Sequence, residues 1–300
     1  MYRLSRFFVM LLVATSAAAQ LPHPDHIVIV IEENKGYKDV IGSPNAPYLN
    51  NELMKRGALL TSSYGLHHPS QPNYVELFSG DEHGVCNDIC PALITAPNLA
   101  ASLLDAGKTF IGYAENLTNE CTEDLFARRH CPWLDFAGIP SSASLDFTSF
   151  PQTPTGFDKL PAVAIVIPNL VDDMHSPSSH LKRSLHIGDT SGEVRSGDQW
   201  LKDHLDAYAT WAVANNSLLV ITWDEDSSFN VPPTSCEHGI TTAPPKNHIP
   251  TFLIGAHVLP GSTSTMVVTH YNVLRTILDM ENLPPLGGSA TAQAITGIWQ

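Results

Sequence analysis

Short runs of apolar residues recur along the chain and predict β-strands. The first, residues 26–31, is a continuous β-branched run, which is typical of a strand buried on both faces of a parallel sheet. Four further runs have a similar character, 109–114, 162–167, 218–223 and 251–254, and residues 58–64 form another strand-like run. Their length and their spacing along the chain predict one central sheet.

Helical patterns lie between these runs. Four segments have helical apolar spacing: 48–56, 97–106, 198–214 and 271–280. A fifth begins near Ser70, where Tyr74, Leu77 and Phe78 are spaced as on one helix face. Strands that alternate with helices predict an α/β fold, here a three-layer sandwich with a mainly parallel central sheet.

Two long stretches lack either pattern. Residues 115–160 and 176–197 are rich in Pro, Ser and Thr, and we expect them to be loop or cap insertions over the mouth of a site. The cap would centre on Cys121 and Cys131. Residues 20–300 are ordinary in length for one α/β domain, so we expect a single catalytic domain there.

The first 19 residues read as a secretory signal. Arg3 and Arg6 form a basic start, an apolar segment follows, and three alanines precede Gln20. The apolar run is too short to span a bilayer, so we favour a cleaved signal over an uncleaved anchor and expect no stable membrane insertion. The prediction is export, either to the periplasm or outside the cell.

Charge and cysteine content narrow the function. The formal charge is −14, and removing residues 1–19, with two arginines and no acid, makes it −16. That sign disfavours a nucleic-acid binder.

Export makes disulfides plausible. We expect up to two bridges among four cysteines, and Cys236 as the unpaired one. The four cysteines are Cys86, Cys90, Cys121 and Cys131.

Acidic and amide side chains follow several of the predicted strands. They are Glu32, Glu33, Asn34, Asn169, Asp172, Asp173, Asp224, Glu225 and Asp226. Any one group could cap a helix or face water. Because ligands bind beyond the carboxyl ends of parallel strands, we expect these groups to converge. Carboxylates gathered in one place repel, and a divalent cation of undetermined identity and number would hold them together.

Ser70 lies where a strand gives way to a helix, so its hydroxyl is either an N-cap or a nucleophile. A metal ion beside it would favour the nucleophile, because the ion lowers the pKa of the hydroxyl. Five histidines are placed near this site: His67, His68, His175, His248 and His270. The remaining histidines, including His130, are assigned to structural or surface roles. The chain contains no G-x-S-x-G elbow, Walker A motif or G-x-G-x-x-G fingerprint.

Several separated motifs, in order, resemble the bacterial phosphoesterase family. That family contains secreted acid phosphatases, including a mycobacterial type, and bacterial phospholipases C, and it belongs to the alkaline-phosphatase-like superfamily. The motifs are VIEEN (30–34), HPSQPNY (68–74), IPNLVDDMH (167–175), GDQWL (197–201), TWDE (222–225) and HYNVLRT (270–276). They span nearly all of residues 20–300.

The resemblance implies a role for each matching residue. Glu33, Asn34, Asp224 and Glu225 correspond to metal ligands. Ser70 corresponds to the nucleophile, which also touches the metal, and His68 lies beside it. Asn73 is expected to contact phosphate oxygen, and Asp173 and His175 belong to the phosphate site or a second metal, with Asp198 in support. We add His248 to the substrate-binding set and His68 and His175 to the catalytic set.

The chain departs from the phospholipase C pattern in two ways. Asp226-Ser227-Ser228 replaces a glycine-rich turn, and we expect no counterpart of the extra C-terminal domains that those lipases carry. We therefore predict an acid phosphatase-like phosphomonoesterase acting on small-molecule or lipid phosphate esters through a phosphoserine. The alternatives are a phospholipase C-type phosphodiesterase and a metal- or phosphate-binding protein without turnover. The leaving alcohol and the oligomeric state are not determined by the sequence.

Overall fold

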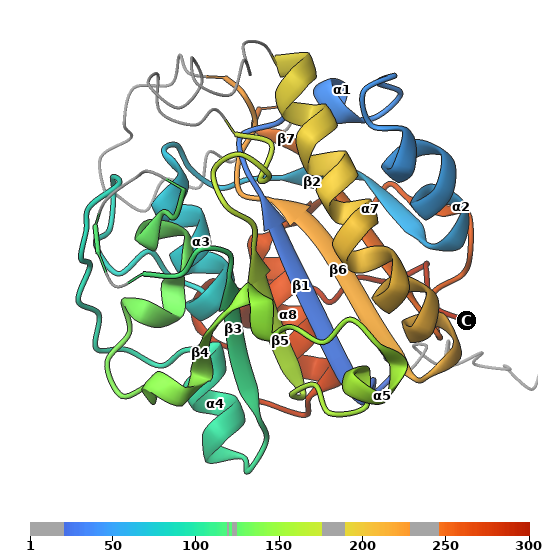
Figure 1. Ribbon diagram of the computed structural model, residues 1–300. Coiled ribbons are helices and arrows are strands. Elements are labelled where there is room, and N and C mark those ends of the chain that lie inside the picture. The colour runs from blue at the N-terminus through green and yellow to red at the C-terminus, as the bar shows by residue number, and fades with distance from the viewer. Residues whose placement is uncertain (1–20, 119, 122–124, 176–189, 229–245) are drawn as a thin grey trace, which may run out of the picture.

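The computed structural model describes residues 21–118, 120–121, 125–175, 190–228 and 246–300 (Figure 1). The predicted signal and Cys236 lie outside the described residues. Within them, no helix combines the length and the apolar character that crossing a membrane requires.

One nine-stranded sheet forms the centre of the molecule, in the order β4-β3-β5-β1-β6-β7-β2-β8, with β9 beside β2. The strands are β1 (His26–Glu32), β2 (Ala58–Tyr64), β3 (Phe110–Ala114), β4 (Ser144–Asp146), β5 (Val163–Ile167), β6 (Ser217–Trp223), β7 (His248–Gly255), β8 (Ser262–Ser264) and β9 (Val268–Thr269). The six predicted runs are all strands here, and the short strands β4, β8 and β9 complete the edges of the sheet.

The sheet is mostly parallel, as predicted, apart from β7. β1 runs parallel to β5 and β6, whereas β7 is antiparallel to both β6 and β2. Because Thr222 near the end of β6 pairs with Thr251 near the start of β7, β7 begins at the edge where β6 ends. His248, the first residue of β7, therefore lies at that edge.

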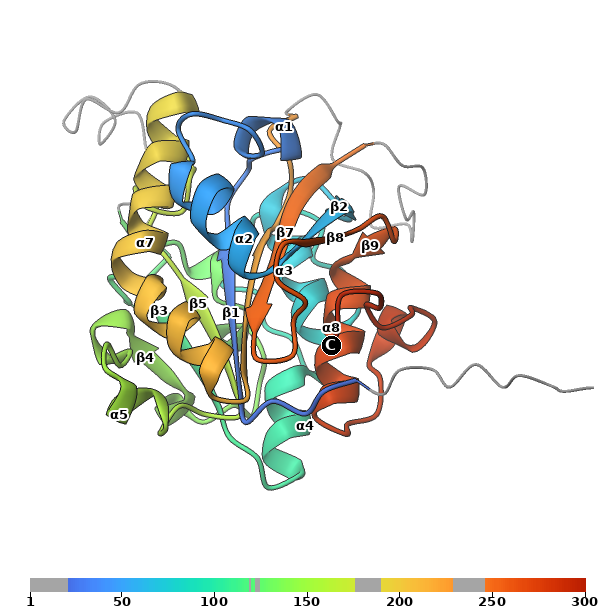
Figure 2. The same ribbon diagram turned by 90° about the vertical axis from the view of Figure 1, so that its right-hand side faces the viewer.

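Helices cover both faces of the sheet (Figures 1 and 2). One face carries α1 (Tyr37–Val40), the π-helical turn Leu49–Leu53, α2 (Met54–Arg56), α5 (Pro154–Phe157) and α7 (Thr190–Ala214). The other carries α3 (Ser70–Ser79), α4 (Leu99–Asp105) and α8 (His270–Met280). Short 3-10 turns complete the fold at Arg128–His130, Pro132–Leu134, Ser141–Ala143, Phe147–Ser149 and Gly287–Ala290.

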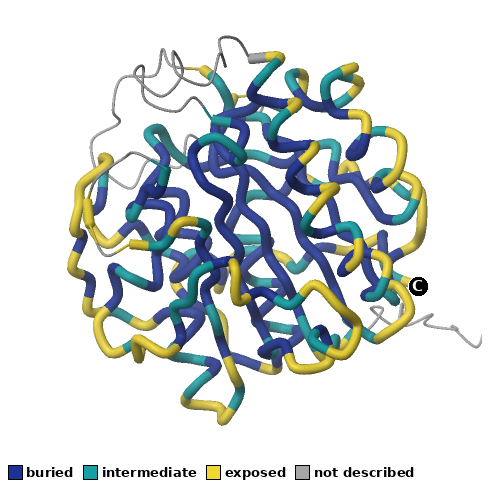
Figure 3. The backbone as a smooth tube through the Cα atoms, in the orientation of Figure 1, coloured by how far each residue is buried: buried dark blue, intermediate teal, exposed yellow. Residues whose placement is uncertain are grey.

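The side chains of β1 show how the three layers are held together. Ile27, Ile29 and Ile31 join the core on the α3 and α8 side, whereas Val28 and Val30 join the core on the α7 side. All five are essentially inaccessible, and the strands form the buried centre of the molecule (Figure 3). This two-faced burial confirms the three-layer sandwich, and it explains why the strand reads as a continuous apolar run.

Helix α7 begins eight residues earlier than the sequence pattern predicts. Residues 190–197, which we expected to be loop, form its first two turns. Gly197 explains part of the difference, because a Cβ there would lie 2.4 Å from Cγ of Met174 and 2.9 Å from the carbonyl oxygen of Asp172. The glycine that weakens the helical signal is the residue that lets α7 approach the 172–174 turn.

The disulfide prediction is partly wrong. Cys90 and Cys121 form a bridge, and Cys86 is also disulfide-bonded. Cys131, which we expected in a bridge, is a free thiol buried in the core between α3, α4 and the neighbouring loops. It packs there as a small apolar residue.

Candidate active site

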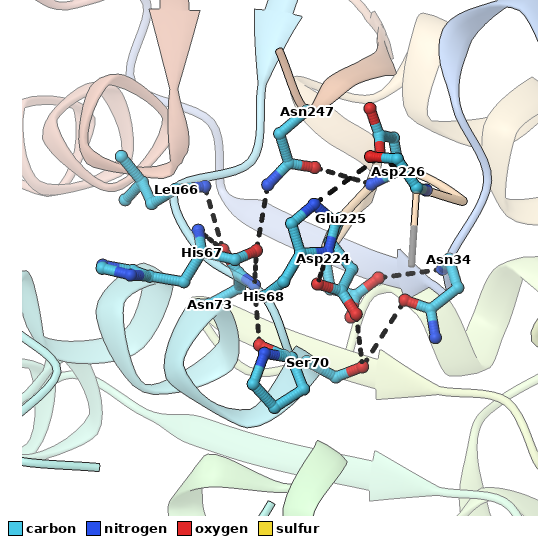
Figure 4. Close-up of polar contacts among 12 residues, drawn as sticks. Asn34, Leu66, His67, His68, Ser70, Asn73, Asp224, Glu225, Asp226 and Asn247 are labelled. Atoms are coloured by element: carbon cyan, nitrogen blue, oxygen red, sulfur yellow. Dashed lines mark hydrogen bonds and ion pairs between the residues drawn. The ribbon is translucent and has the colours of Figure 1, made fainter. Parts of the chain in front are cut away.

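The candidate active site lies at the edge of the sheet where β1, β5 and β6 end. Glu33 and Asn34 follow β1, Asp224 and Glu225 follow β6, and Ser70 is the first residue of α3. The structure therefore brings the five predicted metal ligands together from three separate segments. Figure 4 shows the Ser70 hydroxyl directed toward Asn34 and the acidic residues after β6.

The Ser70 hydroxyl faces three acceptor oxygens. Oγ lies 3.2 Å from Oε2 of Glu33 and 3.2 Å from Oε1 of Glu225. Oδ1 of Asn34 lies 3.5 Å away. A hydroxyl has one proton to donate, so it cannot satisfy three acceptors. Ser70 makes no side-chain cap bond, because Pro69 holds the N-cap position. Its hydroxyl belongs to the polar site and not to helix capping.

The segment before Ser70 is held by two asparagines. Oδ1 of Asn73 accepts the backbone N–H groups of Leu66 and His67, each at 2.9 Å, and its amide donates to the carbonyl of His67 at 3.0 Å. Asn247 donates to the same carbonyl at 2.9 Å and accepts the N–H of Asp226 at 2.7 Å (Figure 4). These bonds fix the segment before α3 against the segment after β6.

A left-handed backbone turn places Asn34. Its φ is +46°, a conformation that asparagine tolerates better than most residues. The turn lets the N–H of Asn34 donate to Oδ1 of Asp224 at 3.0 Å, while the side-chain oxygen faces Ser70. The end of β1 is thereby tied to the end of β6.

His68 contacts the acidic pair after β6. Its Nδ1 is in close contact with Oε2 of Glu225, and its Nε2 lies 3.6 Å from Oδ1 of Asp226. The ring is mostly buried, with 14% of the side chain exposed. It is therefore placed to exchange protons with Glu225 and with a group bound beside Ser70.

A second set of groups surrounds Glu33 on its other side. Nε2 of His130 lies 3.1 Å from Oε1 of Glu33, and the hydroxyl of Tyr74 donates to the same oxygen. Nδ1 of His175 lies 3.5 Å from Oε2 of Glu33. Oδ2 of Asp173 lies 3.9 Å from Nδ1 of His130. His175 and Asp173, both predicted, thus join the site by way of Glu33.

His130 is a site residue that the sequence analysis missed. It lies in a short 3-10 turn within an irregular segment, away from any strand end. Its ring stacks on Tyr74 of α3, with centroids 5.0 Å apart and planes 7° apart. Tyr74 lies in a predicted helix and in the 68–74 motif, but neither signal points to His130, so no local pattern identifies this pairing.

The carboxylates repel one another in this buried setting. Burial first, and then Asp224 and Asp173, raise the pKa of Glu33 well above its usual value. Burial and then Glu225 do the same to the pKa of Asp224. Burial raises the pKa of Asp173 to about 8. The site therefore disfavours several negative charges unless a cation offsets them.

The donor set fits a hard divalent cation. Oδ2 of Asp224 is buried and has no hydrogen-bond partner among the described residues. Glu33, Asn34 and Glu225 present further oxygens around Ser70, and carboxylate and amide oxygens are the ligands that such ions prefer. One orphaned carboxylate oxygen among converging acceptors is the arrangement expected of a metal-ligand set.

Three predicted substrate-binding residues have other contacts. The side chain of Asn73 is occupied by the segment before Ser70, as described above. The carboxylate of Asp198 accepts the N–H groups of Tyr48 and Leu49, each at 2.9 Å, on the α7 face. His248 lines a pocket of about 390 Å³ beside the site, with Tyr37, Asp39 and Asp226. Of the three, His248 is the one that lines this pocket.

Two other histidines placed near the site serve neighbouring structure. His270 is buried, and its Nε2 lies 2.9 Å from the carbonyl oxygen of Trp223. His67 turns away from Ser70, and its Nε2 lies 3.1 Å from Oε1 of Glu76. Of the five histidines, His68 and His175 are those in contact with the carboxylates around Ser70.

Comparisons with known proteins agree with this geometry. A model of the phosphoesterase family matches residues 43–284. A phosphatidylinositol-3-phosphatase of Mycobacterium tuberculosis (strain ATCC 25618 / H37Rv) is 40% identical over 288 residues, which are 94% of this chain and 85% of that protein. An acid phosphatase of Aspergillus fumigatus is 25% identical over 276 residues, or 85% of this chain, and the match spans about half (54%) of that relative.

The fold has solved counterparts. A protein in the alkaline phosphatase superfamily from Vibrio parahaemolyticus superposes with a TM-score of 0.62 at 14% identity, covering 91% of this chain and 71% of that one. The predicted alkaline-phosphatase-like fold is thereby confirmed. The chain belongs to the phosphoesterase family, and it is a phosphoric ester hydrolase.

Proposed function

We propose that this chain is an exported, metal-dependent phosphomonoesterase that uses Ser70 as its nucleophile. The observation that carries the proposal is the placement of Oγ of Ser70 within 3.5 Å of oxygens from Glu33, Asn34 and Glu225. A serine hydroxyl at a helix N-terminus, among oxygens that suit a metal ion, is an arrangement that activates an alcohol for attack.

Glu33, Asn34, Asp224, Glu225 and Ser70 itself would hold the ion. A divalent cation bound there lowers the pKa of the Ser70 hydroxyl and offsets negative charge on the phosphoryl oxygens. The positive end of α3 points at the same place and favours the same charge. These features match phosphoryl transfer, in which positioning and charge stabilisation supply most of the catalysis.

The reaction would proceed in two steps. In the first, Oγ of Ser70 forms a bond to phosphorus while the bond from phosphorus to the leaving oxygen breaks. The Ser70 proton passes to Oε1 of Glu225, 3.2 Å away, and His68 donates a proton to the departing alcohol. In the second, water would attack phosphorus and give a proton to His68. The Oγ–phosphorus bond would break, and Glu225 would return its proton to Oγ of Ser70 with release of inorganic phosphate.

The pocket beside the site suggests the kind of alcohol that leaves. His248 stacks on Tyr37 with ring centroids 4.4 Å apart, and Asp39 and Asp226 line the same space. His248 also stacks on Tyr64, with ring centroids 5.0 Å apart, so its ring is held by two tyrosines. The carboxylate acceptors suit a polyhydroxy alcohol, whose hydroxyls donate to them. The name of the mycobacterial relative, a phosphatidylinositol-3-phosphatase, supports a phosphorylated polyol or its lipid as substrate.

A substrate panel tests the proposal. We would assay p-nitrophenyl phosphate, bis-p-nitrophenyl phosphate and a phosphoinositide monoester across acidic to alkaline pH, with and without a chelator. The expected result is metal-dependent monoester hydrolysis, abolished by Ser70→Ala and kept by Ser79→Ala on the same helix. Cleavage of the diester with no action on either monoester would instead indicate the phospholipase C-type alternative.

A further inference from the structure

A second group of metal-type ligands lies on the opposite side of the segment that leads to Ser70. His67, Glu76 and Glu82 each offer one ligand atom, and these atoms all lie within 4.8 Å of one another. Glu76 belongs to α3, Glu82 follows that helix, and His67 precedes it. None of the three contacts Ser70 in the described structure, so this group is separate from the active site.

The hydrogen bonds of Glu76 are unevenly distributed. Its Oε1 receives both the Tyr271 hydroxyl, at 2.5 Å, and Nε2 of His67, at 3.1 Å. Glu76 is only 1% exposed, and its Oε2 is buried without a hydrogen-bond partner among the described residues. A buried carboxylate oxygen without a partner costs free energy, so the structure leaves an acceptor for a missing positive group.

An ion pair of protonated His67 with Glu76 does not remove this deficit. His67 meets Oε1, the oxygen that Tyr271 already serves, and the nearby carboxylate of Glu82 adds a second negative charge. Within the described parts of the chain, no hydrogen bond or ion pair involves the Glu82 side chain. Two carboxylates against one imidazole therefore leave an excess of negative charge in a mostly buried place.

We propose that His67, Glu76 and Glu82 bind a divalent transition-metal ion, for which Zn²⁺ is the best fit. One imidazole and two carboxylates form a mixed nitrogen and oxygen set, which suits zinc-type ions better than Mg²⁺ or Ca²⁺, whose ligands are all oxygen. A solvent molecule would complete four-fold coordination. His67, with 15% of its side chain exposed, provides the route of entry.

The position of the ion indicates a supporting role. The ion would join His67, before α3, to Glu76 within the helix and to Glu82 after it. Tyr271 of α8 donates to the carboxylate of Glu76. All of these surround the helix that begins at Ser70. We therefore expect the bound ion to stabilise the segment that carries the nucleophile, without touching the substrate.

Zinc counting tests the proposal independently of catalysis. The metal-stripped full chain is dialysed against buffered Zn²⁺ in excess Mg²⁺, and bound zinc per chain is measured by mass spectrometry. We expect Glu82→Gln to bind one ion fewer than the wild type. Asp81→Asn, which removes the same charge one residue away and keeps an acceptor for the N–H of His83, should bind as many as the wild type.

The Asp224→Asn background separates this site from the catalytic one. In that background one zinc ion should remain, it should raise Tm, and adding Glu82→Gln should abolish both effects. His67→Gln provides a second variant if Glu82→Gln does not fold. Equal zinc content in the wild type and Glu82→Gln, or loss of the ion to Mg²⁺, would overturn the inference. Zinc content that stays at one ion in Asp224→Asn after Glu82→Gln is added would overturn it as well.

Discussion

The N–H of Asn34 donates to Oδ1 of Asp224 at 3.0 Å, and the other oxygen of that carboxylate has no hydrogen-bond partner among the described residues. One oxygen therefore joins the ends of β1 and β6, and the second is free to bind an ion. Asp224 therefore has two roles, accepting the N–H of Asn34 and binding an ion, and a substitution can remove the second while keeping the first.

Asp224→Asn should reduce activity and stabilise the metal-free protein. The variant keeps Oδ1 as an acceptor for Asn34 but removes one charge from a buried group of carboxylates. A bound metal ion contributes several kcal/mol to catalysis, so kcat/KM should fall by about 100-fold or more. In a chelator, Tm of the variant should exceed that of the wild type, because less buried charge is unpaired.

Thermal melts with and without a chelator, beside metal analysis, check this prediction. Full metal content together with wild-type activity would contradict the assignment of Asp224 as a ligand. A variant that is less stable than the wild type in the chelator would show that the carboxylates do not repel in the way described.

His68→Gln should slow poor leaving groups more than good ones. General acid catalysis is worth about 10² to 10⁴ in rate, and alkyl phosphates need it more than p-nitrophenyl phosphate does. His68 contacts Glu225 and lies beside Ser70, whereas His83 lies after α3 and contacts Asp81. The measurement is kcat/KM over a series of aryl and alkyl phosphates, with His83→Gln as control. Equal losses across the series would exclude His68 as the proton donor.

Stability should fall below neutral pH because of His270. Burial lowers the pKa of His270, the hydrogen bond to the carbonyl of Trp223 opposes this, and the charge of His67 adds to it, so the pKa falls from 6.5 to about 4. Between pH 6.5 and about 4 the unfolded chain binds a proton at this residue that the folded chain does not. The stability due to neutral His270 is therefore complete above about pH 6.5 and is lost as pH falls toward 4, by up to about 3 kcal/mol.

Urea unfolding from pH 7 to pH 4 measures this loss. His270→Gln keeps an amide donor for the carbonyl of Trp223 and cannot titrate. Its free energy of unfolding should therefore fall less steeply with pH than that of the wild type, by a slope that corresponds to about one proton. Parallel curves for the wild type and the variant would show that His270 does not contribute to acid unfolding.

Gly197→Ala should destabilise the fold even though alanine favours helix. The added methyl group would lie 2.4 Å from Cγ of Met174, and relieving that overlap should cost about 1–3 kcal/mol, more than the ~1 kcal/mol gained in helix propensity. Ser191→Ala, at an exposed position of the same helix, is the control and should be neutral or stabilising. Since Met174 lies between Asp173 and His175, activity should fall as well. A more stable Gly197→Ala would mean that α7 does not press on this turn.

The strands were predictable because their signal is local. β2 begins and ends where the pattern does, and it lies between Gly57 and Gly65. β6 begins one residue earlier than the pattern and is buried along its whole length. The direction of β7 was not predictable, because direction depends on which edge of the sheet the chain has reached. The first turns of α7 were missed because Gly197 lowers helix propensity and is explained only by its contact with Met174.

Some residues of the candidate site could also be predicted from the sequence, and others could not. Glu33, Ser70 and Asp224 could be predicted, because each follows a strand at the carboxyl edge and each lies in a motif of the family. His130 could not, because its place depends on stacking against Tyr74 across two distant segments. Likewise, a family motif places Asn73 beside the nucleophile, but only the structure shows that its amide is used to hold residues 66 and 67.

The most direct test of the account is the identification of the phosphorylated residue during turnover. The metal-loaded protein is mixed with a phosphate monoester, quenched in acid after milliseconds, and digested for peptide mass spectrometry. We predict phosphoserine at Ser70, absent from the chelated protein and from Ser70→Ala. Phosphate on any other residue, or undiminished turnover by Ser70→Ala, would contradict the central claim that Ser70 is the nucleophile.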